Sequence, residues 1–104
     1  MVDLRSGHII ISANLAKKLF NGITFAFATY EKKSKQLLVT PVSSVWFAKI
    51  HGGAQFMLKE RNLKGDKSLA IRQIFIEHEL DVEDGQLNFE MVEKTRLLKI
   101  CLQK

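Results

Sequence analysis

The shortness of its apolar segments is the feature that most restricts what this chain can fold into. Turn-forming residues interrupt the apolar runs, among them Asn21-Gly22, Gly52-Gly53 and Gly65-Asp66. No run approaches the roughly 20 apolar residues that a membrane-spanning helix needs. Segments of this length pack as antiparallel hairpins and short helices. The sequence therefore predicts a single α+β domain over residues 1–104.

The first half predicts a strand, a helix and a hairpin. His8–Ile11 is a β-branched run typical of a strand, and the apolar residues within 15–20 recur at helical spacing. Ser12 is expected to cap this helix by accepting a hydrogen bond from an early backbone N–H. Residues 23–30 and 36–40 are rich in β-forming residues and flank a charged turn, so they are expected to pair as a hairpin.

Two segments are compatible with either a helix or a strand. Residues 42–50 fit a short helix, with a strand as the alternative. Residues 68–79 fit a helix better, because a strand would place Gln73 and Glu77 on the side of the apolar residues. We therefore expect a helix over 68–79, capped by Ser68.

The two halves predict a similar order of elements. A strand at 55–59, the helix at 68–79 and a hairpin over 87–102 repeat the order of the first half. The chain would then contain an internal repeat of 3–42 and 55–102. Each copy would be a β-α-β-β-like unit of short helices and antiparallel hairpins, and the two units would pack as one barrel-like domain about a pseudo-twofold axis. The alternative is chance, because charged turns between apolar strands are common.

The positive charge of the chain is unevenly distributed. The formal net charge is +5, and residues 1–52 carry seven basic residues against two acidic ones. Residues 53–104 carry nine of each, and residues 77–93 contain seven acids without a lysine or arginine. This asymmetry predicts that the first half faces a polyanion. The alternative is that the lysines only keep a small protein soluble.

A resemblance to a DNA-binding family covers the same region. Residues 3–19, Asp-Leu-Arg-Ser-Gly-His-Ile-Ile-Ile-Ser-Ala-Asn-Leu-Ala-Lys-Lys-Leu, resemble the opening of AbrB- and MraZ-type swapped-hairpin domains. That pattern has an Asp, a Gly-Arg pair, a β-branched strand ending in Ile-Pro, and a short basic helix. The resemblance runs mainly over 3–40, with a looser second copy over 64–102. His8 stands where the family has Arg, and Ser12 where it has Pro.

The resemblance implies two units combined in a barrel, with basic residues on loops and helix contacting DNA. The leading hypothesis is a small cytoplasmic DNA-binding protein, an AbrB/MraZ-like transcriptional regulator. Lysine and arginine suit phosphates, and asparagine can read base edges. The expected DNA-contacting residues are Arg5, His8, Asn14, Lys17, Lys18, Lys32, Lys33 and Lys35. The hypothesis depends on whether these residues share one face.

The alternative hypothesis is a non-enzymatic protein-interaction module. Trp46 and Phe47 would anchor a partner, since aromatic side chains are favoured at interfaces. The acidic half of one copy could also pair with the basic half of another and give a homodimer. In that case the basic residues of the first half would serve self-association.

No catalytic residues, metal, cofactor, membrane or small-molecule substrate are expected. The three histidines are far apart in the sequence, and there is neither a Cys-x-x-Cys pair nor a glycine-rich phosphate loop. The lone cysteine, Cys101, cannot form an internal disulfide, which suits a reducing cytoplasm. The beginning of the sequence does not resemble a signal peptide.

Overall fold

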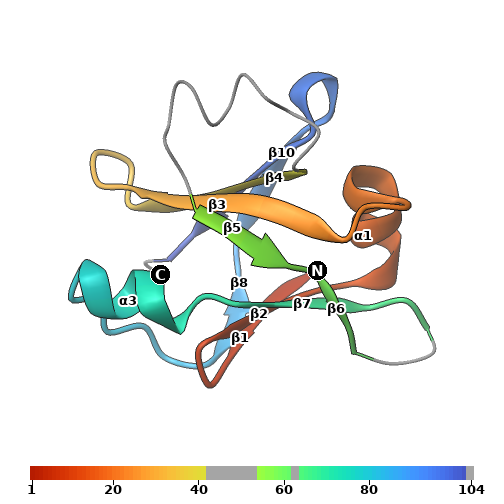
Figure 1. Cartoon of the computed structure of the whole chain (residues 1–104). Helices are drawn as coiled ribbons and strands as arrows, with labels where there is room; N and C mark the ends of the chain where they lie inside the picture. Colours follow the sequence, from red (N-terminus) through yellow and green to blue (C-terminus); the bar gives the residue numbers. More distant parts are fainter. Residues whose placement is uncertain (42–53, 62–63, 103–104) are drawn as a thin grey trace.

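Residues 1–41, 54–61 and 64–102 are described by the computed structural model, and about half of their backbone is β-strand. Ten strands in these described ranges form two antiparallel five-stranded sheets, and the helices there are few and short (Figure 1). The segment 42–50, with Trp46 and Phe47, lies outside the described residues. Within the described residues, no helix is both long and apolar enough to cross a membrane.

Each sheet contains strands from both halves of the chain. The first sheet has the order β6 (Lys59–Glu60), β7 (Lys67–Ala70), β2 (His8–Ile11), β1 (Val2–Arg5) and β8 (Gly85–Leu87). The second has the order β5 (Ala54–Met57), β3 (Phe25–Glu31), β4 (Gln36–Pro41), β10 (Leu97–Cys101) and β9 (Phe89–Val92). The other elements are α1 (Ala13–Phe20), α3 (Arg72–Glu77) and the 3-10 turn η1 (Glu93–Thr95).

One apolar core joins the two sheets and α1. Ile9 and Leu69 contribute from the first sheet, Leu98 and Ile100 from the second, and all four are fully buried. Phe20 adds the largest fully buried side chain from the last turn of α1. Buried residues alternate with more exposed ones along β1 and the first residues of β3, so one face of each of these strands points inward.

Within the described residues, the chain passes from one sheet to the other through α1, between β2 and β3, at Leu58, between β5 and β6, and at Asn88, between β8 and β9. The expected α+β class with antiparallel hairpins is confirmed. The two sheets share no strand ladder among the described strands, so they do not form a closed barrel.

The two halves are interleaved by reciprocal pairing. β1 of the first half pairs with β8 of the second, with Val2 opposite Leu87. Correspondingly, β5 of the second half pairs with β3 of the first, with Phe56 opposite Ala26. Each half therefore contributes a strand that pairs with a strand of the other half. A sequence duplication over 3–42 and 55–102 stays a prediction.

Local departures from the expected elements have identifiable causes. The predicted helix over 68–79 is wrong in its first turn: residues 67–70 form β7, in which Leu69 is buried opposite Ile9, and α3 begins only at Arg72. Ser68 pairs with Ile10 within the sheet and caps nothing. The pairing of β7 with β2 within the first sheet has overridden the local helical spacing.

The predicted helix after the first strand is confirmed as α1, but its expected cap is wrong. Ser12 occupies the N-cap position and makes no capping bond with its side chain, which instead accepts a hydrogen bond from the amino group of Met1 at 2.9 Å. The Ala13 N–H donates to Asp66 Oδ1 at 2.7 Å. A carboxylate from the β6–β7 connection therefore takes the role expected of Ser12.

Candidate nucleic-acid interface

The expected DNA-contacting residues divide between two ends of the molecule. Arg5 and His8 face each other across the β1–β2 turn, whereas α1 follows the far end of β2. The β3–β4 turn, which carries Lys32, Lys33 and Lys35, lies on the opposite side of the view from α1 (Figure 1). The structure therefore does not bring the described lysines of the first half onto one face.

Two hydrogen bonds and a ring contact hold together the end that contains α3. We define this α3 end as residues 72–84 with the β1–β2 turn (5–8) and the β3–β4 turn (31–35). The Ile71 N–H donates to Gly7 O at 3.0 Å, and the Ser6 N–H donates to Asp84 Oδ1 at 3.0 Å. The rings of Tyr30 and His78 lie 5.0 Å apart, which brings the end of β3 against the end of α3.

The α3 end has a slight acidic excess. Its acids are Glu31, Glu77, Glu79, Asp81, Glu83 and Asp84, and its bases are Arg5, Lys32, Lys33, Lys35 and Arg72. The Arg72 guanidinium donates to Ser6 O at 3.1 Å, so it is engaged within this end. The lysines of the β3–β4 turn therefore share their end of the molecule with a group of carboxylates, and no strong positive field is expected there.

The opposite end collects basic residues from three parts of the sequence. We define this α1 end as α1, the described residues of 60–67, and the β9–β10 turn (93–96). Asp66 joins the first two through its bond to Ala13. Lys18, Glu93 and Arg96 line one shallow cavity of about 360 Å³, which joins α1 to the β9–β10 turn.

The α1 end carries an excess of four positive charges. Its bases are Lys17, Lys18, Arg61, Lys64, Lys67, Lys94 and Arg96, and its acids are Glu60, Asp66 and Glu93. Two of the acids are already engaged: Asp66 caps α1, and Glu60 pairs with Lys67 at 3.3 Å. The remaining positive charge is therefore presented to solvent by α1 and its neighbouring turns.

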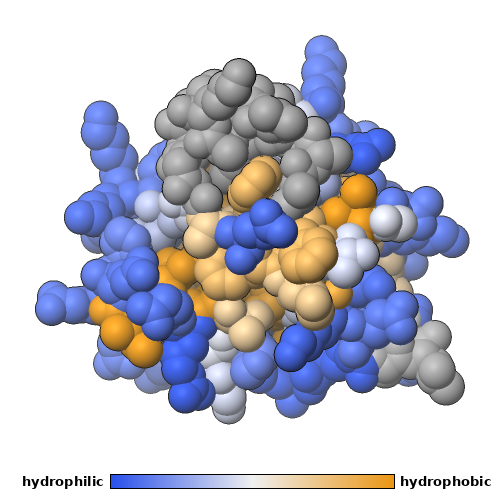
Figure 2. Space-filling model, in the orientation of Figure 1, coloured by the Kyte–Doolittle hydropathy of each residue, from blue (hydrophilic) through white to orange (hydrophobic). Residues whose placement is uncertain are grey.

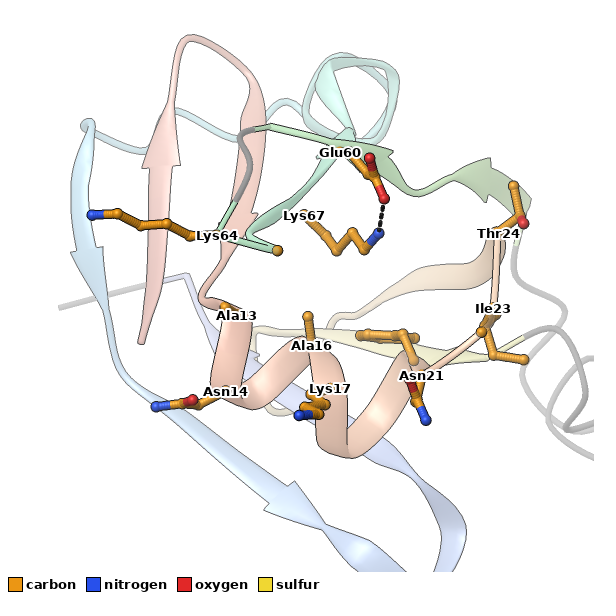
Figure 3. A pocket seen from close by; sticks show the side chains of 13 residues that line it. Ala13, Asn14, Ala16, Lys17, Asn21, Ile23, Thr24, Glu60, Lys64 and Lys67 are labelled. Atoms are coloured by element: carbon orange, nitrogen blue, oxygen red, sulfur yellow. Dashed lines mark hydrogen bonds and ion pairs between the residues drawn. The ribbon is translucent and has the colours of Figure 1, made fainter.

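A groove of about 630 Å³, lined by both polar and apolar residues, separates α1 from β6 and β7 (Figure 3). Lys67 pairs with Glu60 on the neighbouring strand along one wall of the groove, while Asn14 on α1 and Asn21 just after it line the other wall (Figure 3). Lys17 and Lys18 are exposed between these two asparagines. Lys17, Lys18 and Asn21 follow Asn14 by three, four and seven residues, and this helical spacing places all four side chains on one outer face of the helix.

Sequence reasoning missed Arg61, Lys64, Lys67, Lys94 and Arg96 as members of a basic surface. The net charge of residues 53–104 gives no sign of these basic residues, because the acidic residues within 77–93 offset them and the net charge of that half is zero. A count over a shorter window would have found four basic and two acidic residues within 59–67. The proximity of Arg61, Lys64 and Lys67 to α1 follows from the pairing of β7 with β2, which places the β6–β7 hairpin beside α1, whereas Arg96 shares a cavity lining with Lys18.

No group of three His, Cys, Asp or Glu side chains among the described residues lies close enough to hold a metal ion. Cys101 is half-buried in β10, where its Sγ accepts a hydrogen bond from Gln36 Nε2 at 3.8 Å.

The chain was also compared with known proteins. Neither a protein-family model, nor a curated protein, nor a solved structure matches it. Its function is therefore inferred from its own residues and fold.

Proposed function

We propose that this protein binds double-stranded DNA through the α1 end, as a non-enzymatic transcriptional regulator of the AbrB/MraZ kind. The observation that carries the proposal is the excess of four positive charges at the α1 end, against a slight acidic excess at the α3 end. Duplex DNA is a dense line of negative charge, and lysines and arginines that neutralise its phosphates supply most of the sequence-independent affinity.

The dimensions of α1 suit a groove of duplex DNA. An α-helix with its side chains is about 10–12 Å across, close to the roughly 12 Å width of the major groove, and α1 has eight residues to lay along it. Lys17 and Lys18 would contact phosphates, and the flanking turns with Arg61 and Arg96 would extend those contacts along the backbone. Asn14 and Asn21 lie on the same outer face and could each reach a base edge, where an asparagine pairs best with adenine.

This proposal narrows the residues expected from the sequence. Asn14, Lys17 and Lys18 stay in the interface. Arg5, His8 and the β3–β4 lysines are assigned to the α3 end and are not expected to contact DNA. The resemblance of residues 3–19 to AbrB and MraZ openings supports the class of partner, and the charge distribution supports which end it meets.

Two pairs of adjacent exposed lysines provide the test and its matched control. K17A/K18A removes two charges from the α1 end, and K32A/K33A removes two from the α3 end, so both variants have the same net charge. Fluorescence anisotropy with a random-sequence duplex, repeated over a salt series, gives the slope of log K against log salt. The slope should become shallower by about 2 for K17A/K18A and stay unchanged for K32A/K33A.

Equal losses in the two variants would mean that only net charge matters and that the α1 end is not the interface. Absence of any wild-type binding at about 50 mM salt, where electrostatic association is favoured, would reject DNA as the partner. Circular dichroism of both variants checks that the loss of lysines leaves the fold intact.

A further inference from the structure

An apolar side chain stands exposed within the acidic α3 end. Ile76 is 62% exposed on α3, and Glu77 and Glu79 follow it directly in the chain. Figure 2 shows an apolar patch over α3 that hydrophilic residues enclose. Such a side chain offers an apolar anchor for a partner whose surface combines a small apolar groove with positive charge.

The α1 end of the same chain has a surface of that kind. A groove of about 360 Å³ lies between α1 and β9, with Met1, Leu15, Phe89 and Met91 in its lining and Lys18 at its charged side. Met1 and Phe89 are 61% and 38% exposed, so apolar surface is open to a partner there. Lys18 also borders the neighbouring cavity with Arg96, which adds a second positive charge nearby.

We infer that the α3 end of one copy docks on the α1 end of a second copy, with Ile76 in the groove between α1 and β9. Glu77 and Glu79 would then lie near Lys18 and Arg96. The second copy is the favoured occupant because the two surfaces complement each other in both properties. One is acidic with a projecting apolar side chain, and the other is basic with an apolar groove.

The position of the two surfaces determines what kind of assembly forms. α1 and α3 lie on opposite sides of the molecule (Figure 1). A contact between two different surfaces is heterologous, so each added copy leaves one groove and one Ile76 free. The copies therefore join head to tail and grow into short chains. The contact has one apolar anchor and exposed charges, so it is weak and is weakened further by salt.

The inference does not depend on DNA binding, because it is tested with the protein alone. Sedimentation velocity of the full chain at low salt, up to about 1 mM protein, should show a mean mass that keeps rising with concentration. Variant I76D removes the anchor and keeps the groove, whereas F89E spoils the groove and keeps the anchor. Each variant should stay monomeric by itself.

An equimolar mixture of I76D and F89E provides the decisive measurement. Each retains one intact surface, so the mixture should form particles of two copies and grow no further. M57D is the matched control: Met57 is 48% exposed on β5, outside both surfaces, and its replacement should leave association as in the wild type.

Three results would overturn the inference. One is a wild type that stays monomeric over the whole concentration range. Another is a wild type that stops at two copies, since that indicates a closed symmetric contact. The third is a mixture of I76D and F89E that remains monomeric although both variants have wild-type circular dichroism spectra.

Discussion

Replacing Asp66 by alanine is expected to destabilise a helix 53 residues away in the sequence. Asp66 Oδ1 accepts a hydrogen bond from the Ala13 N–H at 2.7 Å, in a partly buried position at the start of α1. The carboxylate also lies at the positive end of the helix dipole. D66A removes this carboxylate, so the Ala13 N–H in the first turn of α1 loses its hydrogen-bond acceptor.

The magnitude follows from the contact. Loss of a helix cap costs about 1 kcal/mol, and hydrogen bonds to charged groups cost about 1.5–3 kcal/mol. A short, partly buried bond to a carboxylate should therefore contribute about 1–2 kcal/mol. In a domain of this size, 1 kcal/mol corresponds to about 4 °C in Tm. D66A is expected to lower Tm by about 4–8 °C and to reduce the unfolding free energy measured in urea by the same 1–2 kcal/mol.

Two further variants make the test specific. D66N keeps an oxygen acceptor without the charge and should lose less than D66A. S12A removes the side chain that the sequence suggests as the cap. Because Ser12 makes no capping bond to the helix, its loss should stay within about 0.5 kcal/mol. A loss for S12A as large as that for D66A would refute this account of how α1 begins.

Two other substitutions test the turns and the core. Gly7 has φ +80°, and a Cβ there would lie 3.0 Å from Arg72 Cβ, whereas Gly22 has φ +74° and open space around it. G7A should therefore lower the unfolding free energy more than G22A does, by about 1 kcal/mol or more, as measured by thermal unfolding. Thr40 is fully buried and its Oγ1 donates to Arg96 O at 3.0 Å, so T40V should lower the urea-unfolding free energy by about 1 kcal/mol, and an unchanged value would mean that this bond contributes nothing.

The parts of the fold that were predictable are those in which local pattern and tertiary contacts agree. The isoleucines of β2 and the spacing of buried residues in α1 were sufficient for both elements. β1 was missed, although Val2 and Leu4 are buried and alternate with polar neighbours. Four residues of alternation are a weak signal in isolation. They became a strand because β2 and β8 pair with both edges of β1.

The candidate interface was predictable only in its α1 portion. Lys17 and Lys18 were visible as the outer face of an amphipathic helix. The position of the β3–β4 lysines at the end rich in acids depends on contacts such as that between Tyr30 and His78, which link residues distant in sequence. The basic residues of 60–67 reach α1 because β7 pairs with β2. Neither contact is encoded in a local motif.

The interleaving of the two halves has a consequence for how the chain reaches its native state. β1 lies in the interior of its sheet, yet its neighbour β8 is 85 positions later, at Val2 opposite Leu87. During synthesis the β1–β2 hairpin would emerge with both outer edges unpaired. These edges would stay unpaired until most of the chain, including β7 and β8, had been synthesised. Closing such long loops costs conformational entropy before the stabilising contacts form, which slows folding. Folding is therefore expected to take milliseconds to seconds, as in other folds rich in non-local strand pairing. For the same reason neither half is expected to fold in isolation, whereas two separately produced halves should acquire structure only on mixing.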